Sequence, residues 1–529
     1  MRYFTNSSTS ILALLATLLL SNFVHADPQL TSWFTAGSTK YARIYTSISN
    51  RTAGISAITW TNTNNPSNSQ TLPTYAGVHE INYSPNWVYI RNSGLAPYIM
   101  GPWNNPNLPK NQGTSTNVYR FPRIPTVISN LTNTTNRTLT GQGSIGFLVD
   151  GVALYNTSDG FSYSVSNGKD AAPNANIGPG DGVWNRDAWP NERDSFDYPL
   201  NHPQPSGQYH AHANPIGVRY VLGDNINYDS STKIYSENTS ATNWKHSPII
   251  GWVNDGLPLY GPYGYSDPTN PTSPIRRMVS GYVLRNGTYG TVNLAISGRT
   301  SLPKWAQQAQ GKTNPLIASQ YGPLVSTNYE LGHFSEDYEY LGDLEFTQGV
   351  SSTINGYTTL FDLNKYNARF CVTPEYPSGT WAYFTTITSS GTPWYPYNVG
   401  RWYMATPPAS TGTPPTPGNN TTLTVMNSDM PLTKYYKGGT NNAETWSSNP
   451  VTISGGTVTL KWNAVEGGTY QVSTSTNLSS SAWTPLSEIA TPVGNSGEKI
   501  DTVNSSTTPR KFYKLTRTGM STAYDSVGY

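Results

Sequence analysis

The stretches GFLVDGVALY (Gly146–Tyr155) and GWVNDGLPLY (Gly251–Tyr260) share the frame G-x-x-x-D-G-x-x-L-Y. In each, two short apolar runs flank an Asp-Gly pair. This is typical of a hairpin with a type I′ turn, because glycine tolerates the positive φ that the turn needs. Two interpretations are open: two ordinary hairpins, or a duplicated β unit that makes the large N-terminal region pseudo-symmetric. In both, Asp150 and Asp255 are turn formers and not catalytic acids.

Outside these hairpins the chain reads mostly as short β-rich runs broken by Gly, Pro, Asn and Asp, such as Lys40–Ser49 and Val218–Asp224. Helical signals are scarce. The best is Ser301–Gly311, which has a Ser cap, an early Pro and a closing Gly. We therefore predict an all-β fold with few short helices, built as a large multi-sheet β domain followed by a smaller β-sandwich.

Residues 1–26 have the features of a secretory signal peptide. Arg2 gives a positive start, Ile11–Leu20 is a short apolar run, and Val24–Ala26 is a small-residue cleavage site. No later stretch is long and apolar enough to span a membrane. The sequence predicts a secreted protein, extracellular or at the cell surface, whose mature chain begins at Asp27.

A Pro/Thr/Gly-rich stretch over residues 406–422 is predicted to be a semi-extended linker. It separates the β domain, residues 27–405, from a C-terminal module over residues 423–529. The module alternates apolar and polar residues in several runs and has the size of an immunoglobulin- or fibronectin-like sandwich. Its last run is a weak strand, so we expect the sandwich to be short of a strong closing strand.

Charge and cysteine content exclude several classes of function. The chain has 32 basic and 30 acidic residues, a net charge of +2 and no basic block, which argues against a nucleic-acid partner and against a polybasic membrane patch. The acidic run Ser335–Glu345 is predicted to be a solvated loop. The single cysteine, Cys371, excludes an intrachain disulfide and is predicted to be a buried small hydrophobe. Twelve Asn-x-Ser/Thr sites after residue 26 make glycans candidate partners.

The candidate functional residues centre on GQYHAHANP (Gly207–Pro215). Successive side chains of a strand point to opposite faces, so His210 and His212 share one face about 7 Å apart at Cα. That spacing allows both imidazoles to reach one divalent metal ion, which needs further ligands. The predicted metal set is His210, His212, His202, Asp197, Glu192 and His246. Three interpretations are open: buried structural imidazoles, a bound divalent ion of unknown identity, or acid/base catalysis without a metal.

Several blocks resemble the YHYH family, named after a Tyr-His-Tyr-His motif. The main block is Gly182–Pro215; three further stretches, Ser247–Tyr265, Leu363–Phe384 and Gly94–Trp103, are similar to other segments of such proteins. The resemblance covers most of residues 30–400 and omits the C-terminal module. It implies a secreted protein and assigns no activity. Ala211 stands where the family has the second tyrosine, so any role of that side chain is missing here.

Two classes of function follow. The neutral, Tyr/Asn/Thr-rich composition favours a non-enzymatic extracellular structural or surface protein. Such a protein would assemble with copies of itself into a fibre or pilus-like filament by strand addition, with Asp27–Gly37 as the donor strand. The alternative is a metal-dependent secreted enzyme or metal-binding protein centred on the YHAH motif, which for catalysis needs an open coordination position.

Overall fold

The computed structural model describes the chain between residues 27 and 520, with gaps. The described residues are 27–35, 41–71, 74–104, 106–112, 118–128, 137–173, 175–341, 352–354, 357–359, 361–408, 433–437, 446–463, 468–477, 483–486, 496–503 and 510–520. The predicted signal peptide and most of the predicted linker lie outside them. Among them no helix has the length and apolarity needed to cross a membrane.

An eight-stranded sheet forms the centre of the molecule, and the prediction of an all-β fold with few short helices is confirmed. Two hairpins, β6–β7 and β15–β16, lie in its middle and pair through β6 and β15. The strand order is β11 (His202–Pro203), β12 (Tyr209–Ala211), β7 (Ala153–Tyr155), β6 (Ser144–Leu148), β15 (Ile249–Val253), β16 (Pro258–Tyr260), β24 (Thr380–Phe384) and β23 (Ala368–Cys371).

The two halves of this sheet are related by a pseudo-twofold axis between β6 and β15. In the first hairpin Ser144 pairs with Tyr155, and in the second Ile249 pairs with Tyr260; both hairpins shift register at the next residue. The outer strands repeat the pattern, since β12 runs parallel to β7 and β24 runs parallel to β16, each with an antiparallel neighbour outside it. The pairing therefore favours a duplicated β unit over two unrelated hairpins.

The turns of the two hairpins differ from the predicted type I′. Only the glycines have a positive φ, 84° at Gly151 and 86° at Gly256, whereas a type I′ turn needs two such residues. The Asp150 and Asp255 carboxylates instead accept hydrogen bonds from the backbone N–H two residues further on, at 3.1 and 3.2 Å. The type I′ prediction is wrong, while the two aspartates do shape the turns.

A second sheet covers the N-terminal part, with strands in the order β25 (Thr433–Lys437), β2 (Val78–Tyr83), β3 (Trp87–Asn92) and β5 (Val118–Pro122). Its edge strand β25 belongs to the region predicted as C-terminal module, yet it pairs with β2. The chain start, including helix α1 (Pro28–Thr31), buries Leu30, Trp33 and Phe34 in the main core. The segment predicted as a donor strand thus packs on its own domain.

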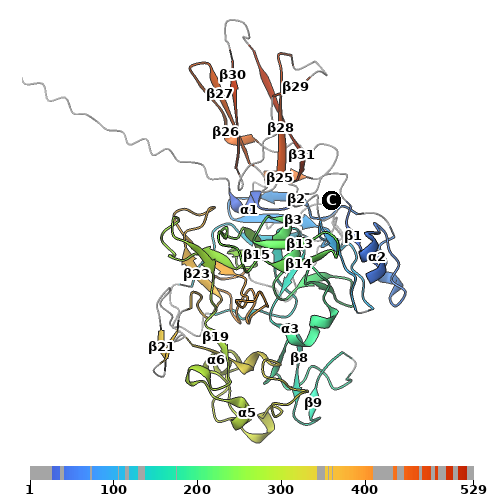
Figure 1. Cartoon of the computed structure of the whole chain (residues 1–529), viewed down its shortest axis with the longest axis vertical. Coiled ribbons are helices and arrows are strands. Elements are labelled where there is room, and N and C mark those ends of the chain that lie inside the picture. The colour runs from blue at the N-terminus through green and yellow to red at the C-terminus, as the bar shows by residue number, and fades with distance from the viewer. Residues whose placement is uncertain are drawn as a thin grey trace, which may run out of the picture.

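The C-terminal part is β-rich and has a small core of its own. Its two antiparallel sheets have three strands each: β26 (Trp446–Ser454), β27 (Thr457–Asn463) and β30 (Ser496–Thr502) in one, and β29 (Thr484–Pro485), β28 (Gly468–Ser475) and β31 (Phe512–Met520) in the other. Leu460, Trp462 and Tyr470 lie at the centre of this core. Figure 1 shows these strands at one end of the long axis and helices α5 and α6 at the other.

Short elements complete the large region. The small sheets comprise β1 (Arg43–Ile44) with β4 (Ile99–Met100); β10 (Asn185–Asp187) with β8 (Ser158–Ser164) and β9 (Lys169–Asp170); β13 (Ile226–Asp229) with β14 (Ile234–Glu237); β17 (Tyr263–Tyr265) with β18 (Ile275–Arg277); β19 (Tyr282–Leu284) with β20 (Tyr338–Tyr340); and β21 (Ser352–Ile354) with β22 (Tyr357–Thr359). The other α-helices are α2 (Ile48–Ala53), α3 (Ala188–Glu192), α4 (Ile216–Val221), α5 (Leu294–Ser297) and α6 (Lys304–Gln310), and the 3₁₀ turns are η1 (Pro66–Asn68), η2 (Arg193–Ser195), η3 (Thr288–Gly290), η4 (Ala318–Gln320) and η5 (Ser335–Asp337).

Some local predictions hold and others fail. Helix α6 forms inside Ser301–Gly311, with Gly311 in the left-handed C-cap position, although Pro303 rather than Ser301 precedes its first turn. The predicted strand Val218–Asp224 is wrong, because most of it is helix α4. Val218, Val221 and Leu222 are all buried, which is the spacing of one helical face. The run Lys40–Ser49 contains only the two-residue strand β1 before α2 begins.

Two predictions about buried side chains have opposite outcomes. Cys371 is fully buried in β23, as predicted. The acidic run Ser335–Glu345 is not a solvated loop at its start, because Glu336 and Asp337 are buried. Arg299 donates to both carboxylate oxygens of Asp337, each at 2.7 Å, so a buried ion pair replaces solvation there.

Candidate metal centre

The strands β11 and β12 lie at one edge of the central sheet and place three histidines on one of its faces. His202 on β11 pairs directly with His210 on β12, and His212 follows two residues later. Tyr209 lies on the opposite face, where its hydroxyl donates to Asp197 at 2.6 Å. The predicted alternation of side chains along this strand is therefore confirmed, and the cross-strand register adds His202 to the pair.

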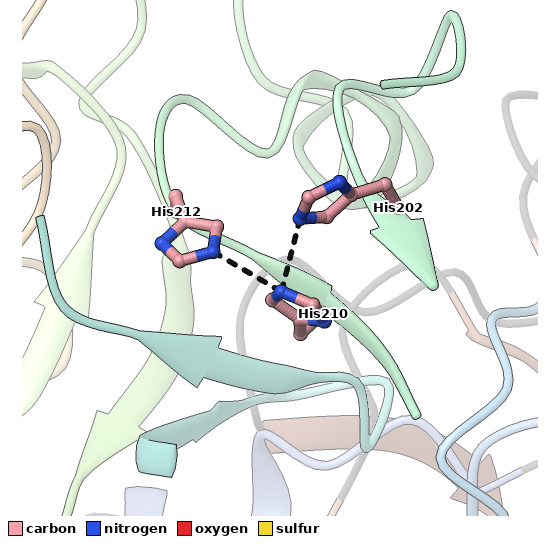
Figure 2. Close-up of side chains that lie close together, drawn as sticks. All are labelled: His202, His210 and His212. Atoms are coloured by element: carbon pink, nitrogen blue, oxygen red, sulfur yellow. Dashed lines mark hydrogen bonds between the residues drawn. The ribbon is translucent and has the colours of Figure 1, made fainter. Parts of the chain in front are cut away.

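The three imidazoles converge on one point through their Nε2 atoms. His210 Nε2 lies 3.0 Å from His202 Nε2 and 3.1 Å from His212 Nε2, as the dashed lines in Figure 2 indicate. All three rings are buried, with 3 to 5% of each residue exposed. Of the described residues, these three form a group whose ligand atoms lie within 4.8 Å of one another.

The hydrogen bonds on the other ring nitrogens assign the tautomers. His210 Nδ1 contacts the carbonyl oxygen of Gln208 at 3.1 Å, and His212 Nδ1 contacts that of Asn156 at 2.7 Å. A carbonyl only accepts, so both Nδ1 atoms carry the hydrogen and both Nε2 atoms are bare lone pairs. The two Nε2 atoms therefore cannot hydrogen-bond to each other in the neutral state.

His202 has the same tautomer for a different reason. Its Nδ1 lies 2.6 Å from Ser195 Oγ, and that hydroxyl donates its own hydrogen to the Glu192 carbonyl at 2.7 Å. The serine oxygen must then accept from His202 Nδ1. Three unprotonated Nε2 atoms thus face one another in a buried space, an arrangement that repels itself unless a cation sits among them.

Protonation of a histidine does not supply that cation near neutral pH. Burial lowers the pKa of His202 and His210 well below the usual value, and the neighbouring imidazoles lower it further. Burial also lowers the pKa of His212, to about 4. The cluster is therefore neutral at pH 7 and presents three lone pairs to a metal ion.

Glu192, the last residue of α3, completes the donor set. Its Oε2 lies 3.5 Å from His212 Nε2 and 3.8 Å from His202 Nε2, and this buried oxygen has no hydrogen-bond partner among the described residues. Burial, with a contribution from Asp159, raises the pKa of Glu192 to about 8. The Glu192 side chain as a whole is 29% exposed, although the oxygen that faces the histidines is buried. A bound cation would favour the ionised carboxylate.

The other two predicted ligands lie elsewhere. Asp197 Oδ2 accepts from Tyr209 Oη at 2.6 Å and from the Gly101 N–H at 2.8 Å, on the face of β12 opposite the histidines. His246 lies beside Tyr260 and Tyr265, with ring centroids 5.3 and 4.8 Å away. Asp197 therefore fixes the strand from behind, and His246 belongs to the other half of the central sheet.

The structure adds residues to the site that the sequence analysis did not single out. Tyr155 stacks on His210, with centroids 4.1 Å apart, and Phe196 packs edge-on against His202 at 4.3 Å. Ser195 and the carbonyl of Asn156 orient two of the rings. Tyr155 had a usable signal, since it closes the repeated G-x-x-x-D-G-x-x-L-Y frame. The backbone acceptors had none.

The pseudo-twofold axis identifies the position in the second half that corresponds to this cluster. The strand pairings map His202 to Arg369, His210 to Ala382 and His212 to Phe384. The Arg369 guanidinium lies 5.5 Å from the centre of the Phe384 ring. In the second half, a positively charged side chain of the protein therefore lies where the first half has the histidines. The duplicated sheet thus carries the three-histidine arrangement in its first half alone.

The same mapping identifies the residue in the second half that corresponds to Ala211, the position at which the family motif has its second tyrosine. Ala211 corresponds to Tyr383, whose hydroxyl donates to Asp255 Oδ2 at 2.7 Å. Asp150 is the counterpart of Asp255, and its buried Oδ2 has no hydrogen-bond partner among the described residues. A tyrosine at position 211 would be placed to make the bond that Asp150 lacks.

These features define a class: a β-rich protein with a duplicated central sheet and one buried cluster of three histidines at the end of its first half. The family model described as "YHYH protein" matches residues 118–397, and this match covers more than half of the sequence. The chain belongs to this family. All eight strands of the central sheet lie inside the matched region. No curated protein and no solved structure matches the chain significantly.

Proposed function

We propose that this protein is a secreted structural or surface protein whose β domain binds one divalent transition-metal ion through His202, His210, His212 and Glu192. The convergence of three unprotonated Nε2 atoms supports this proposal most directly. Imidazole suits zinc, copper, iron and nickel, and a closed set of four nitrogen and oxygen ligands is typical of zinc. We therefore take zinc as the first candidate.

The ion would act as a cross-link. Its ligands come from β11, from β12 with the residue after it, and from α3, three elements of at most five residues each. A secreted chain without disulfides needs such stabilisation. A ligand that binds the folded state alone adds about 2.7 kcal/mol at a hundredfold excess over its Kd. This stabilisation is the role that we propose for the ion.

The second candidate, a metal-dependent enzyme, is supported by the exposure of Glu192. With 29% of this side chain exposed, water or a substrate could reach the fourth ligand position if the carboxylate moved away. Three histidines and a water would then form an open catalytic set. A substitution of Glu192 separates the two roles. If the site is structural, loss of this carboxylate lowers the affinity for the metal ion and the stability of the fold, and no enzymatic activity appears.

Metal binding is tested by equilibrium dialysis of chelator-treated protein against zinc, cobalt, nickel and copper salts, followed by elemental analysis. Wild-type protein is expected to bind one equivalent and to unfold at a higher temperature with the ion. His210→Ala is expected to abolish binding. Glu192→Gln, at a partly exposed position, should keep the fold and weaken binding about 10- to 100-fold.

The matched control is His246→Ala, which removes a half-buried imidazole outside the cluster. It is expected to retain one equivalent of metal. No binding of any of the four ions by wild-type protein would refute the proposal. So would an equal loss in His210→Ala and His246→Ala, because the effect would then come from general destabilisation.

The remaining proposals concern the C-terminal module, secretion, glycosylation and self-assembly. The two small sheets and separate core agree with an immunoglobulin-like module, and the signal-like start supports secretion. Glycans would modify exposed sites such as Asn477, but not Asn82 or Asn156, which are buried. Self-assembly by strand addition stays a prediction, and the burial of Trp33 and Phe34 speaks against Asp27–Gly37 as its donor.

A further inference from the structure

A groove of about 360 Å³ lies in another part of the large region, between β19, the turn η3 and the segment 387–394. None of its lining residues belongs to the histidine cluster. Its volume is that of a small-molecule site, and its walls combine aromatic rings with side chains that hydrogen-bond. The lining residues include Arg277, Tyr282, Asn286, Thr288, Tyr289 and Trp394.

Two aromatic side chains form fixed surfaces of the groove. Trp394 is held in place because its indole N–H donates to the Tyr282 carbonyl at 2.8 Å. Tyr289 has φ 56° and ψ 26°, a left-handed backbone conformation that costs free energy for a non-glycine residue. Strain of this kind persists where the surrounding structure needs the side chain in one direction. Flat aromatic rings of this type suit the C–H face of a ring-shaped ligand.

Arg277 contributes a cation without a counter-ion. It donates to the Ile387 carbonyl at 2.7 Å, and no carboxylate of the described residues lies within ion-pair distance of it. Its neighbour Arg276 is neutralised, since its guanidinium binds both oxygens of Asp362 at 2.7 and 2.6 Å. Burial lowers the pKa of Arg277, and the more distant Tyr263 and Asp362 offset only part of this effect.

Hydroxyl and amide groups stand at the exposed rim. Asn286 and Thr288 are both exposed and line the groove together with Ser389. These groups can exchange hydrogen bonds with the hydroxyls of a sugar, while Arg277 offers a planar fork that matches a carboxylate. A neutral sugar would leave the arginine uncompensated, and a small inorganic anion would leave the aromatic surfaces unused.

We propose that this groove binds a carboxylate-bearing sugar ring, such as a uronic acid residue of an acidic polysaccharide, with Arg277 on the carboxylate and Trp394 and Tyr289 against the ring. This function is independent of the metal ion. It gives the large β domain an attachment site for an anionic glycan outside the cell.

The test is isothermal titration calorimetry of the full mature chain with trigalacturonic acid, and with maltotriose as the neutral trisaccharide. Wild-type protein is expected to bind the acidic sugar and to bind the neutral one at least about tenfold more weakly. Arg277→Gln should lower affinity for trigalacturonic acid about 10- to 100-fold, since a hydrogen bond to a charged group is worth about 1.5–3 kcal/mol. Arg277→Lys, which keeps the charge and loses the fork, should fall between.

Arg510→Gln is the matched control, because it removes the same charge from an exposed position in the C-terminal part. It should bind like wild type. Trp394→Phe, which preserves a ring, should weaken binding of both sugars by the same factor and leave their ratio unchanged. Thermal unfolding of each variant reports whether the fold is intact. Equal affinity for the two sugars, unchanged affinity in Arg277→Gln, or no heat with trigalacturonic acid would each overturn the proposal.

Discussion

At the scale of single residues, the chemistry of the histidine cluster depends on which ring nitrogen carries the hydrogen. Carbonyl oxygens of Gln208 and Asn156 hold the Nδ1 hydrogens of His210 and His212, so the Nε2 atoms are free to bind a cation. The same reasoning separates the two turn aspartates, which have equivalent positions and unequal partners.

Asp150 is the clearest residue for a pH-dependent prediction. Burial raises its pKa to about 7, while the Tyr383 hydroxyl and the Ala405 N–H hold the pKa of Asp255 nearer its usual range, at about 6. The folded state therefore keeps the Asp150 proton at pH values where the unfolded chain has released it. Stability from this group is present at low pH and is lost as pH rises from about 4 to about 7.

Asp150→Asn is expected to be more stable than wild type at pH 8, by at most about 4 kcal/mol, and to show little gain at pH 4. Urea unfolding at both pH values measures this difference. Asp255→Asn should gain less at pH 8, because its amide nitrogen would face the Ala405 N–H or the Tyr383 hydroxyl. A pH-independent difference between Asp150→Asn and wild type would contradict the assignment of a raised pKa.

At the scale of elements, the two Asp-Gly hairpins are the repeated unit from which the central sheet is built. Both turn glycines have a positive φ, and Gly256 also lies close to neighbouring backbone: a Cβ at Gly256 would lie 2.4 Å from the Pro122 carbonyl oxygen. This contact ties the second hairpin to strand β5 of the neighbouring sheet. The turn thus serves packing between sheets as well as chain reversal.

Gly256→Ala is expected to destabilise the protein by at least about 3 kcal/mol, because the backbone strain adds to a clash that no side chain can relieve. Gly168→Ala is the matched control, since Gly168 has φ 62° and nothing within 4 Å of the added Cβ. It should cost only about 1 kcal/mol. Chemical unfolding measures the stability of both variants. Equal losses of unfolding free energy would show that the contact with Pro122 does not contribute to the effect.

At the scale of the whole molecule, the first described residues hold the two main sheets together. Trp33 is 1% exposed and packs 5.5 Å from Phe121 of β5, while the Phe34 N–H donates to the Val149 carbonyl of the first hairpin turn. A segment in this role contributes to the fold of its own chain. It is a poor candidate for a strand that leaves to join a second copy.

Trp33→Ala is therefore expected to cost about 3–5 kcal/mol of unfolding free energy, as for other large aromatic side chains removed from a core. Ile48→Ala, at a position 63% exposed, should change stability by less than about 0.5 kcal/mol. Calorimetry together with size-exclusion chromatography measures both stability and assembly. If Trp33→Ala left the monomer stable and only abolished assembly, the donor-strand prediction would be favoured instead.

The sequence by itself determined what depends on near neighbours along the chain. The period-two alternation of a strand placed His210 and His212 on one face, and the repeated Asp-Gly frame predicted two hairpins and left their symmetry open. Patterns over a few residues also gave a wrong prediction. Val218–Asp224 is a short apolar run, and such a run fits a strand or a buried helix equally well.

Only the tertiary structure decided which distant groups meet. It joined His202 and Glu192 to the histidine pair and sent Asp197 to the opposite face. It also filled the equivalent position in the second half with Arg369, and it left Arg277 with no ion-pair partner among the described residues. The physical reason is that burial, tautomer and charge compensation depend on atoms supplied by segments far apart in the chain, whose pairing is set by packing of the whole core.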